Sequence, residues 1–294
     1  LETETLLISK DGTLRYLPFA ALFDGEQYLA EQFNLVVFTP ASRSLLNETA
    51  EEGRPLELRI AGLGMSDEAE GFRRLPAVEE ELDLIVKEDD QNDERGILPG
   101  NVRLNRDFTA QSLSEMLGQG YPVVHIASHF YFRPGTIENS FILLGDGSRL
   151  ALADLKSRRY PFRFIDLLTL SACDTAVGGE DAQGREIESF ATLAQNRGAQ
   201  SILATLWPVS DASTGIFMAL FYQLRKEQQL TKVEALRKAQ KMFISGGLDG
   251  IHTVPEHRGV AVAEEDKGIF RPSLQAPFAH PFYWAPYILI GNML

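Results

Sequence analysis

The sequence predicts an α/β protein in which a mostly parallel central sheet is flanked by helices, the architecture of a caspase-like sandwich. Two observations lead to this prediction. Short runs of apolar and β-branched residues alternate with helical patterns along most of the 294 residues, and strand–helix–strand order builds parallel sheets. Several of these runs are apolar throughout, as expected of inner strands covered by helices on both faces.

Nine segments have the composition of strands. They are rich in Val, Ile, Leu and Phe, and turn-forming Gly, Pro, Asn or Asp residues bound most of them. In chain order, the predicted strands are 4–9, 13–18, 34–40, 56–63, 122–128, 141–146, 164–172, 200–207 and 285–292.

Five segments between the strands carry apolar residues at helical spacing. Thr231 followed by Glu234 forms a capping box, which predicts a helix start, and Thr109 is a candidate cap of another helix. Gly198 favours a helix end at that position. The predicted helices are 77–88, 109–120, 186–199, 211–227 and 231–243.

Residues 245–281 depart from this alternation, because they are rich in Gly, Pro and charged residues and have little periodicity. They predict a long loop before the last strand, longer than an ordinary connection. A second loop is predicted around Gly62-x-Gly64. That pair resembles part of a dinucleotide fingerprint, but Asp67 stands where a third Gly or Ala is needed.

Composition limits the classes of partner. With 28 basic and 41 acidic residues, the net charge is −13. This charge disfavours direct binding to nucleic acid or to an anionic membrane surface and favours basic peptides.

A single cysteine allows no internal disulfide, which predicts a reducing, cytoplasmic location. No apolar run is long enough to span a membrane, and no signal peptide is recognisable. The start at Leu1 suggests a piece of a longer protein.

The strongest candidate for chemistry is a His–Cys pair. His129 follows one predicted buried strand and Cys173 follows another, 44 residues later. Parallel neighbours that end at the same edge of a sheet bring such residues together, at the edge where α/β folds bind ligands. A nucleophilic cysteine needs a base, and histidine is the residue that titrates near neutral pH. The order and spacing are close to those of caspases.

Other assignments remain open for these residues. Cys173 can instead be a small buried apolar residue, as most free cysteines are. His125 is the rival base, although its place inside an apolar run favours a core histidine hydrogen-bonded to a neighbour. A zinc site from His125 and His129 would want helical spacing and a third ligand, so no metal or cofactor is predicted. Acidic Glu180 and Asp181 favour a solvated loop.

Two residues near the end of the strand at 200–207 are candidates for a substrate pocket. Asp211 or Ser210 caps the following helix by default, but the position of Asp211 beyond a strand edge also suits a carboxylate that selects a basic side chain. Trp207 can form a pocket wall or simply pack in the core.

The chain resembles the CHAT domain family, caspase-like cysteine peptidases that are often fused to tetratricopeptide (TPR) arrays in bacteria and are distantly related to separase. The blocks that carry the resemblance span most of the chain in the family's order. They are 11–46, 123–130 (VVHIASHF), 139–155, 167–179 (LLTLSACDTAVGG), 201–224, 234–240 and 280–292.

The resemblance implies one peptidase domain over 1–294, with a pseudo-caspase-like N-terminal half (1–120) and a catalytic half (121–294). His129 would be the catalytic histidine and Cys173 the nucleophile, with the backbone N–H groups of Phe130 and Cys173 holding the oxyanion. Asp211 matches an acidic position that recognises basic P1 residues in separase-like relatives.

The function implied by this resemblance is cleavage of proteins or peptides after Arg or Lys, regulated by a partner such as a TPR or sensor region. The alternative is a protein-interaction module with the same fold and no turnover. Retention of both His129 and Cys173 favours the enzyme.

Overall fold

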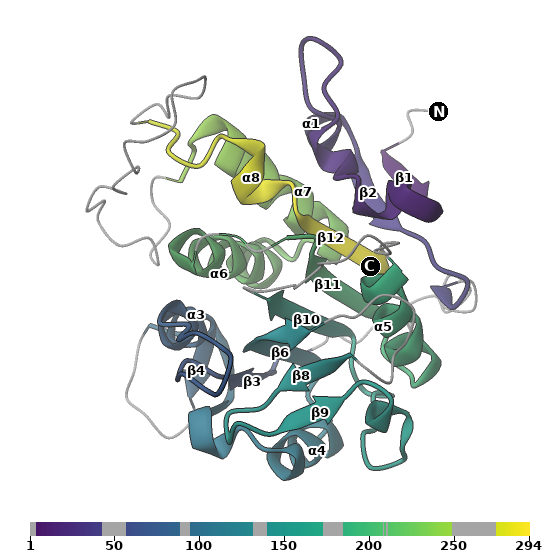
Figure 1. Ribbon diagram of the computed structural model, residues 1–294. Coiled ribbons are helices and arrows are strands. Elements are labelled where there is room, and N and C mark those ends of the chain that lie inside the picture. Colours follow the sequence, from purple (N-terminus) through teal and green to yellow (C-terminus); the bar gives the residue numbers. More distant parts are fainter. Residues whose placement is uncertain are drawn as a thin grey trace.

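The computed structural model describes residues 4–42, 57–88, 95–131, 140–172, 185–207, 209, 211–248 and 275–294. Figure 1 shows a central sheet with helices packed against both faces. Helices α3, α6 and α7 lie on one face, whereas α4 and α5 lie on the other. The fold class predicted from the sequence is therefore confirmed.

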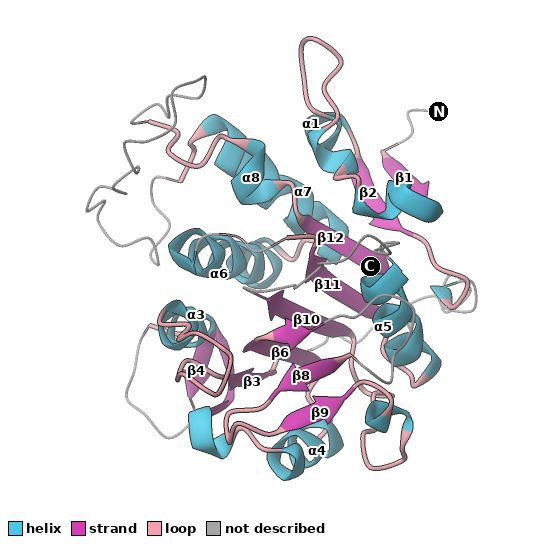
Figure 2. Cartoon of the chain, viewed as in Figure 1, coloured by secondary structure: helices cyan, strands magenta, loops and turns pink. Residues whose placement is uncertain are grey.

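The central sheet has nine strands within the described residues. In Figure 2 the labelled strands form a band from β1 and β2 at the upper right to β3 and β4 at the lower left. In spatial order they are β1 (Thr5–Ile8), β2 (Asn34–Val37), β12 (Tyr287–Gly291), β11 (Ser201–Thr205), β10 (Leu167–Ala172), β6 (Val123–Ser128), β3 (Ile60–Gly64), β5 (Leu98–Leu104) and β4 (Val86–Glu88).

Strand directions divide this sheet into two parallel blocks. Strands β11, β10, β6, β3, β5 and β4 run in one direction, and β1, β2 and β12 run in the other. The antiparallel pairing of β11 with β12 joins the blocks. Strands from the first forty residues thus lie beside a strand from the C-terminal end, so one sheet combines both ends of the chain.

A second, small sheet follows β6 directly. It contains β7 (Phe130–Tyr131), β8 (Phe141–Leu143) and β9 (Arg149–Ala151), all antiparallel. Phe130, Ile142 and Leu150 belong to the same buried cluster as the α4 and α5 side of the central sheet. The small sheet therefore holds the chain just beyond the end of β6, next to the candidate residue His129.

Five of the described α-helices lie largely where the sequence places them, whereas the short helices α1 and α8 were not predicted. The described α-helices are α1 (Leu29–Gln32), α3 (Ala77–Ile85), α4 (Ala110–Gly118), α5 (Arg185–Asn196), α6 (Asp211–Gln228), α7 (Lys232–Ser245) and α8 (Pro281–Trp284). The side chain of Thr231 accepts a hydrogen bond from Glu234 N and completes the predicted capping box. Thr109 caps α4 in the same way through Ser112.

Some predicted elements are wrong. Residues 13–18 do not form a strand, because Gly12–Tyr16 is a short 3-10 helix (η1) that the Asp11 side chain caps. The helix predicted to reach residue 88 ends at Ile85, and its last residues form β4. Of the loop predicted at 245–281, residues 249–274 lie outside the described residues, and α8 begins at Pro281.

The Gly62-x-Gly64 pair lies inside β3 and not in the predicted loop. A Cβ atom on Gly64 would lie 2.7 Å from the side chains of both Leu82 and Val78 on α3. Glycine is needed here because α3 packs directly against the strand. The pair therefore has a packing role, in agreement with the incomplete nucleotide fingerprint.

Candidate active site

The two strands that precede the candidate catalytic residues are neighbours in the sheet. Strands β6 and β10 run parallel, and Ala172 pairs with Ser128 in their register. The next residue after Ser128 is His129, and the next after Ala172 is Cys173. Cys173 lies outside the described residues. The ends of the two strands nevertheless lie side by side, as the sequence predicts.

His129 is completely buried just beyond β6. Its Nε2 atom lies 2.9 Å from the backbone carbonyl oxygen of Arg73, and its ring packs against Phe72 with 5.1 Å between ring centroids. Both contacts come from the loop between β3 and α3. The imidazole is therefore held between the end of β6 and this loop.

The contact with Arg73 determines which nitrogen of the His129 ring carries hydrogen. A carbonyl oxygen only accepts, so Nε2 is the donor in this hydrogen bond. In the neutral ring Nδ1 then has the lone pair, and Nδ1 is the atom able to take a proton from another group. Sequence analysis did not identify Arg73. Its carbonyl is a backbone group that any residue supplies, so no side-chain pattern marks it.

His125 has a different environment, on the face of β6 that packs against α3 and α6. Its Nε2 lies 3.0 Å from Glu81 Oε1, and its Nδ1 lies 3.2 Å from the Tyr222 hydroxyl. The Tyr222 hydroxyl also lies 2.7 Å from Thr169 Oγ1 on β10. Both ring nitrogens of His125 are thus engaged in a buried network, which favours the core histidine over the rival base.

Phe130, whose backbone N–H is a predicted oxyanion donor, lies in β7. Leu143 N donates to His129 O at 3.0 Å, so Phe130 and Ile142 form a non-hydrogen-bonded pair of the β7–β8 ladder. The Phe130 N–H is therefore directed to the side of β7 opposite β8. Its φ is not positive, so the residue accommodates a side chain without backbone strain.

The candidate pocket residues follow β11, the next strand beyond β10. Trp207 is half-buried, and its Nε1 donates to Phe282 O in α8 at 3.1 Å. It packs against the hydrophobic clusters on both faces of the sheet. Asp211 is the first residue of α6, and the structure describes its backbone alone. Both residues thus lie beyond the same sheet edge as His129.

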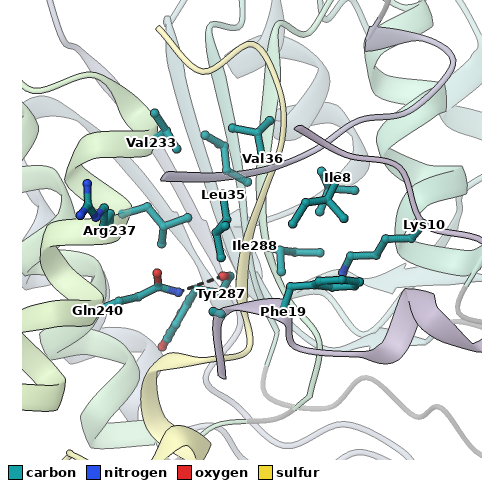
Figure 3. Close-up of a pocket in the computed structure, with 14 residues that line it drawn as sticks. Ile8, Lys10, Phe19, Leu35, Val36, Val233, Arg237, Gln240, Tyr287 and Ile288 are labelled. Atoms are coloured by element: carbon teal, nitrogen blue, oxygen red, sulfur yellow. Dashed lines mark hydrogen bonds between the residues drawn. The ribbon is translucent and has the colours of Figure 1, made fainter. Parts of the chain in front are cut away.

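A separate hollow lies away from His129, in the part of the sheet formed by β1, β2 and β12. It is between α7, β2 and β12 (Figure 3). It has a volume of about 20 Å³, room for about one water molecule. Buried Lys10 lines it, with Nζ 3.3 Å from Leu17 O and 5.3 Å from the centroid of the Phe19 ring. Burial lowers the pKa of Lys10 to about 8. The hollow is too small for a peptide or a nucleotide.

The described residues contain no group of three or more His, Cys, Asp or Glu side chains arranged to hold a metal ion. Both ring nitrogens of His125 contact other side chains, those of Glu81 and Tyr222. Within the same part of the chain, no helix is both long and apolar enough to cross a membrane.

Comparison with known families identifies the chain. The family model of the CHAT domain matches residues 1–292. The chain therefore belongs to the CHAT domain family, and its mostly parallel sheet flanked by helices is the caspase-like fold. No curated protein sequence matches it.

Solved structures agree with this fold. Separase of Saccharomyces cerevisiae, from its complex with securin, aligns over 94% of this chain with a TM-score of 0.51 and 14% identity. The chain corresponds to only 14% of that separase chain, so the likeness shows a shared fold alone. Pyridoxal kinase of Staphylococcus aureus bound to pyridoxal aligns over 66% of this chain and 89% of its own, with 11% identity and a TM-score of 0.26. A TM-score this low does not indicate a shared fold.

Proposed function

We propose that the protein is a cysteine endopeptidase in which His129 and Cys173 form the catalytic dyad. The observation that carries this proposal is the register of β6 and β10, which pairs the last residues of the two strands, Ser128 and Ala172. The hydrogen bond from His129 Nε2 to Arg73 O adds the third element of such a site, because it orients the ring. Family membership is consistent with this chemistry.

The first step forms the nucleophile. Cys173 Sγ–H transfers its proton to Nδ1 of His129, which produces a thiolate and an imidazolium ion. The imidazolium has two N–H donors, and Arg73 O accepts one of them. This acceptor stabilises the charged ring in a buried place, and the other N–H is the proposed proton donor to the leaving amine.

Acylation follows from attack of the thiolate on the scissile carbonyl carbon. The S–C bond forms, and the carbonyl electron pair moves onto the oxygen. The backbone N–H groups of Phe130 and Cys173 are the proposed donors to this oxyanion, a device worth roughly 3–4 kcal/mol per donor in other proteases. The orientation of the Phe130 N–H away from β8 supports this role. His129 then protonates the leaving amine as the C–N bond breaks.

Deacylation uses the same groups in reverse. Nδ1 of His129 takes a proton from water, and the resulting hydroxide attacks the thioester carbon. The second tetrahedral intermediate expels the Cys173 thiolate and releases the carboxylic acid product. This sequence of steps requires no metal ion.

For the substrate, we propose a protein segment with Arg or Lys at P1. Asp211 would pair with the basic side chain, and the half-buried Trp207 would form one wall of the pocket. Support comes from the place of both residues just beyond β11, at the same sheet edge as His129. The net charge of −13 also favours a basic substrate. A TPR or sensor region outside these residues is the proposed regulator.

The test is cleavage of a peptide library that varies only at P1. We expect the wild type to cleave after Arg and Lys, and Cys173→Ala and His129→Ala to lower the rate at least a thousandfold. Asp211→Asn should lower cleavage after Arg but not after norleucine. Equal cleavage by the wild type and Cys173→Ala would refute the peptidase. An unchanged preference for Arg over norleucine in Asp211→Asn would refute the pocket.

A further inference from the structure

The loop that binds His129 is closed by hydrogen bonds at its base. We call residues 65–75, between β3 and α3, the His129 loop. At its start, Met65 N donates to Ala127 O at 3.0 Å, two residues before His129. At its end, Leu75 N donates to Ser66 O at 2.9 Å, two residues after Arg73. The position of the Arg73 carbonyl relative to the imidazole therefore depends on Ser66.

Asn105 is the residue that holds Ser66. Its Oδ1 accepts hydrogen bonds from Ser66 N at 2.7 Å and from Asp67 N at 3.2 Å. Its Nδ2 donates to Ser66 Oγ at 2.9 Å, and that hydroxyl in turn donates to Glu79 Oε1 at 2.5 Å. One amide side chain thus fixes the backbone of two successive residues at the base of the His129 loop.

The backbone of Asn105 is itself constrained. Its φ is +51°, in the left-handed region, where Asn is tolerated better than most residues. Phe108 N donates to Asn105 O at 2.8 Å, and a Cβ on Gly145 would lie only 1.8 Å from that oxygen. The turn before β9 therefore packs directly on Asn105. An amide on such a fixed backbone reaches the loop in one orientation.

We infer that Asn105 is a positioning residue for His129: it fixes Ser66, Ser66 fixes the end of the His129 loop, and the loop holds the Arg73 carbonyl against Nε2. The ring contact between Phe72 and His129 is kept by the same loop, through the paired hydrogen bonds between Phe72 and Ala69. The consequence for catalysis rests on the proposed peptidase function, but the consequence for the imidazole does not.

Two substitutions distinguish the effect of the Asn105 amide group from the effect of the backbone conformation at this position. Asn105→Gly removes the side chain and keeps a residue that adopts positive φ readily. Asn105→Asp keeps the Oδ1 acceptor for Ser66 N and Asp67 N. It replaces the Nδ2 donor with a second carboxylate oxygen and adds a negative charge near Glu79. The matched control is Gln229→Gly, because Gln229 is the other described non-glycine residue with positive φ, at +53°. It controls for the entropy that a new glycine adds to the unfolded chain.

The readout is solvent exchange of the His129 Nε2 proton, followed by NMR of the imidazole and assigned with His129→Gln. We expect slow exchange in the wild type, at least tenfold faster exchange in Asn105→Gly, and exchange within threefold of the wild type in Asn105→Asp and Gln229→Gly. Amide exchange of Val124 in β6 reports global opening and should be equal in both glycine variants.

The inference is overturned if Asn105→Gly exchanges within twofold of the wild type, or if Asn105→Asp is as fast as Asn105→Gly. Should Asn105→Gly fail to fold, amide exchange in the wild type replaces it. The Ser66 and Leu75 amides, which hold the two ends of the His129 loop, should then be protected to the same degree as the His129 Nε2 proton, and protection that differs more than tenfold is equally decisive against the inference. Relative to the wild type, kcat/KM for peptide cleavage should fall at least tenfold in Asn105→Gly and be close to the wild-type value in Asn105→Asp. If neither the wild type nor any variant cleaves peptides but proton exchange responds as expected, the positioning role stands and the peptidase function is refuted.

Discussion

Removal of the Tyr222 hydroxyl tests the buried network that separates His125 from the candidate site. In the folded protein, this hydroxyl contacts both His125 Nδ1 and Thr169 Oγ1, and all three side chains are completely buried. Burial raises the pKa of the Tyr222 phenol above its usual range, so the phenol stays protonated and can donate. Tyr222→Phe leaves the ring in place and removes both hydrogen bonds.

The expected cost follows from the two partners that lose the hydroxyl in Tyr222→Phe. A buried polar group left without a partner costs about 1–3 kcal/mol, and both His125 and Thr169 lose one here. We therefore expect Tyr222→Phe to lower the free energy of unfolding by about 2–4 kcal/mol. Thr169→Val should cost about 1 kcal/mol, because the Tyr222 hydroxyl still donates to His125. The double variant should cost less than the sum, since the two apolar side chains then face each other without an unsatisfied hydroxyl.

The assay is urea denaturation followed by circular dichroism for the wild type, both single variants and the double variant. Tyr160→Phe is the matched control. Tyr160 is also buried, but its hydroxyl has no hydrogen bond within the described residues, so we expect a change below about 0.5 kcal/mol. A cost of Tyr222→Phe no larger than that of the control, or strict additivity in the double variant, would refute the network.

Two further predictions concern stability. Burial lowers the pKa of Lys10 from 10.5 to about 8. The folded state therefore loses this proton at a lower pH than the unfolded state does. Between pH 8 and 10.5 the free energy of unfolding should rise, relative to that of Lys10→Met, by up to about 3 kcal/mol. Urea midpoints of both proteins at pH 7 and pH 10 measure this, and a pH-independent difference would contradict it. Gly64→Ala should cost about 1–3 kcal/mol, because the new Cβ would meet Leu82 and Val78 at 2.7 Å. A thermal melt unchanged from the wild type would show that α3 moves away freely.

The parts of the fold that sequence analysis predicted well are the ones buried on both faces. Strands β6, β10 and β11 are continuous apolar runs, and burial of such runs leaves few alternatives to an inner strand. The capping box at Thr231 predicts the start of α7 because it satisfies backbone donors locally, without help from the rest of the protein.

Strand β5 was missed because of its composition. Pro99 and Gly100 usually mark a turn. In the structure, a Cβ at residue 100 would lie 1.8 Å from Ile60 O on the neighbouring strand, so glycine is required by the close approach of β3. Such a requirement becomes visible only after β3 and β5 are paired. The place of β12 between β11 and β2 could not be predicted either, because β2 comes from the other end of the chain.

The candidate site, like the fold, could be predicted from the sequence only in part. The ends of two buried strands predicted that His129 and Cys173 would follow adjacent strands, and the register of β6 and β10 agrees with this. The Arg73 carbonyl could not be foreseen, because a backbone acceptor has no sequence signature. Asn105 was equally hidden, since its role depends on a loop that begins at Met65, far from it in the sequence.

The central claim is that His129 and Cys173 interact, and alkylation of the thiol tests it without a known substrate. Because the chain has one cysteine, intact-mass spectrometry after treatment with iodoacetamide reports Cys173 alone. We expect the rate in the wild type to follow an apparent pKa well below the ordinary thiol value of about 8.5. His129→Gln should return the apparent pKa to about 8.5, whereas His125→Gln should leave it low. An ordinary thiol pKa in the wild type, or one that responds to His125→Gln and not to His129→Gln, would contradict the dyad.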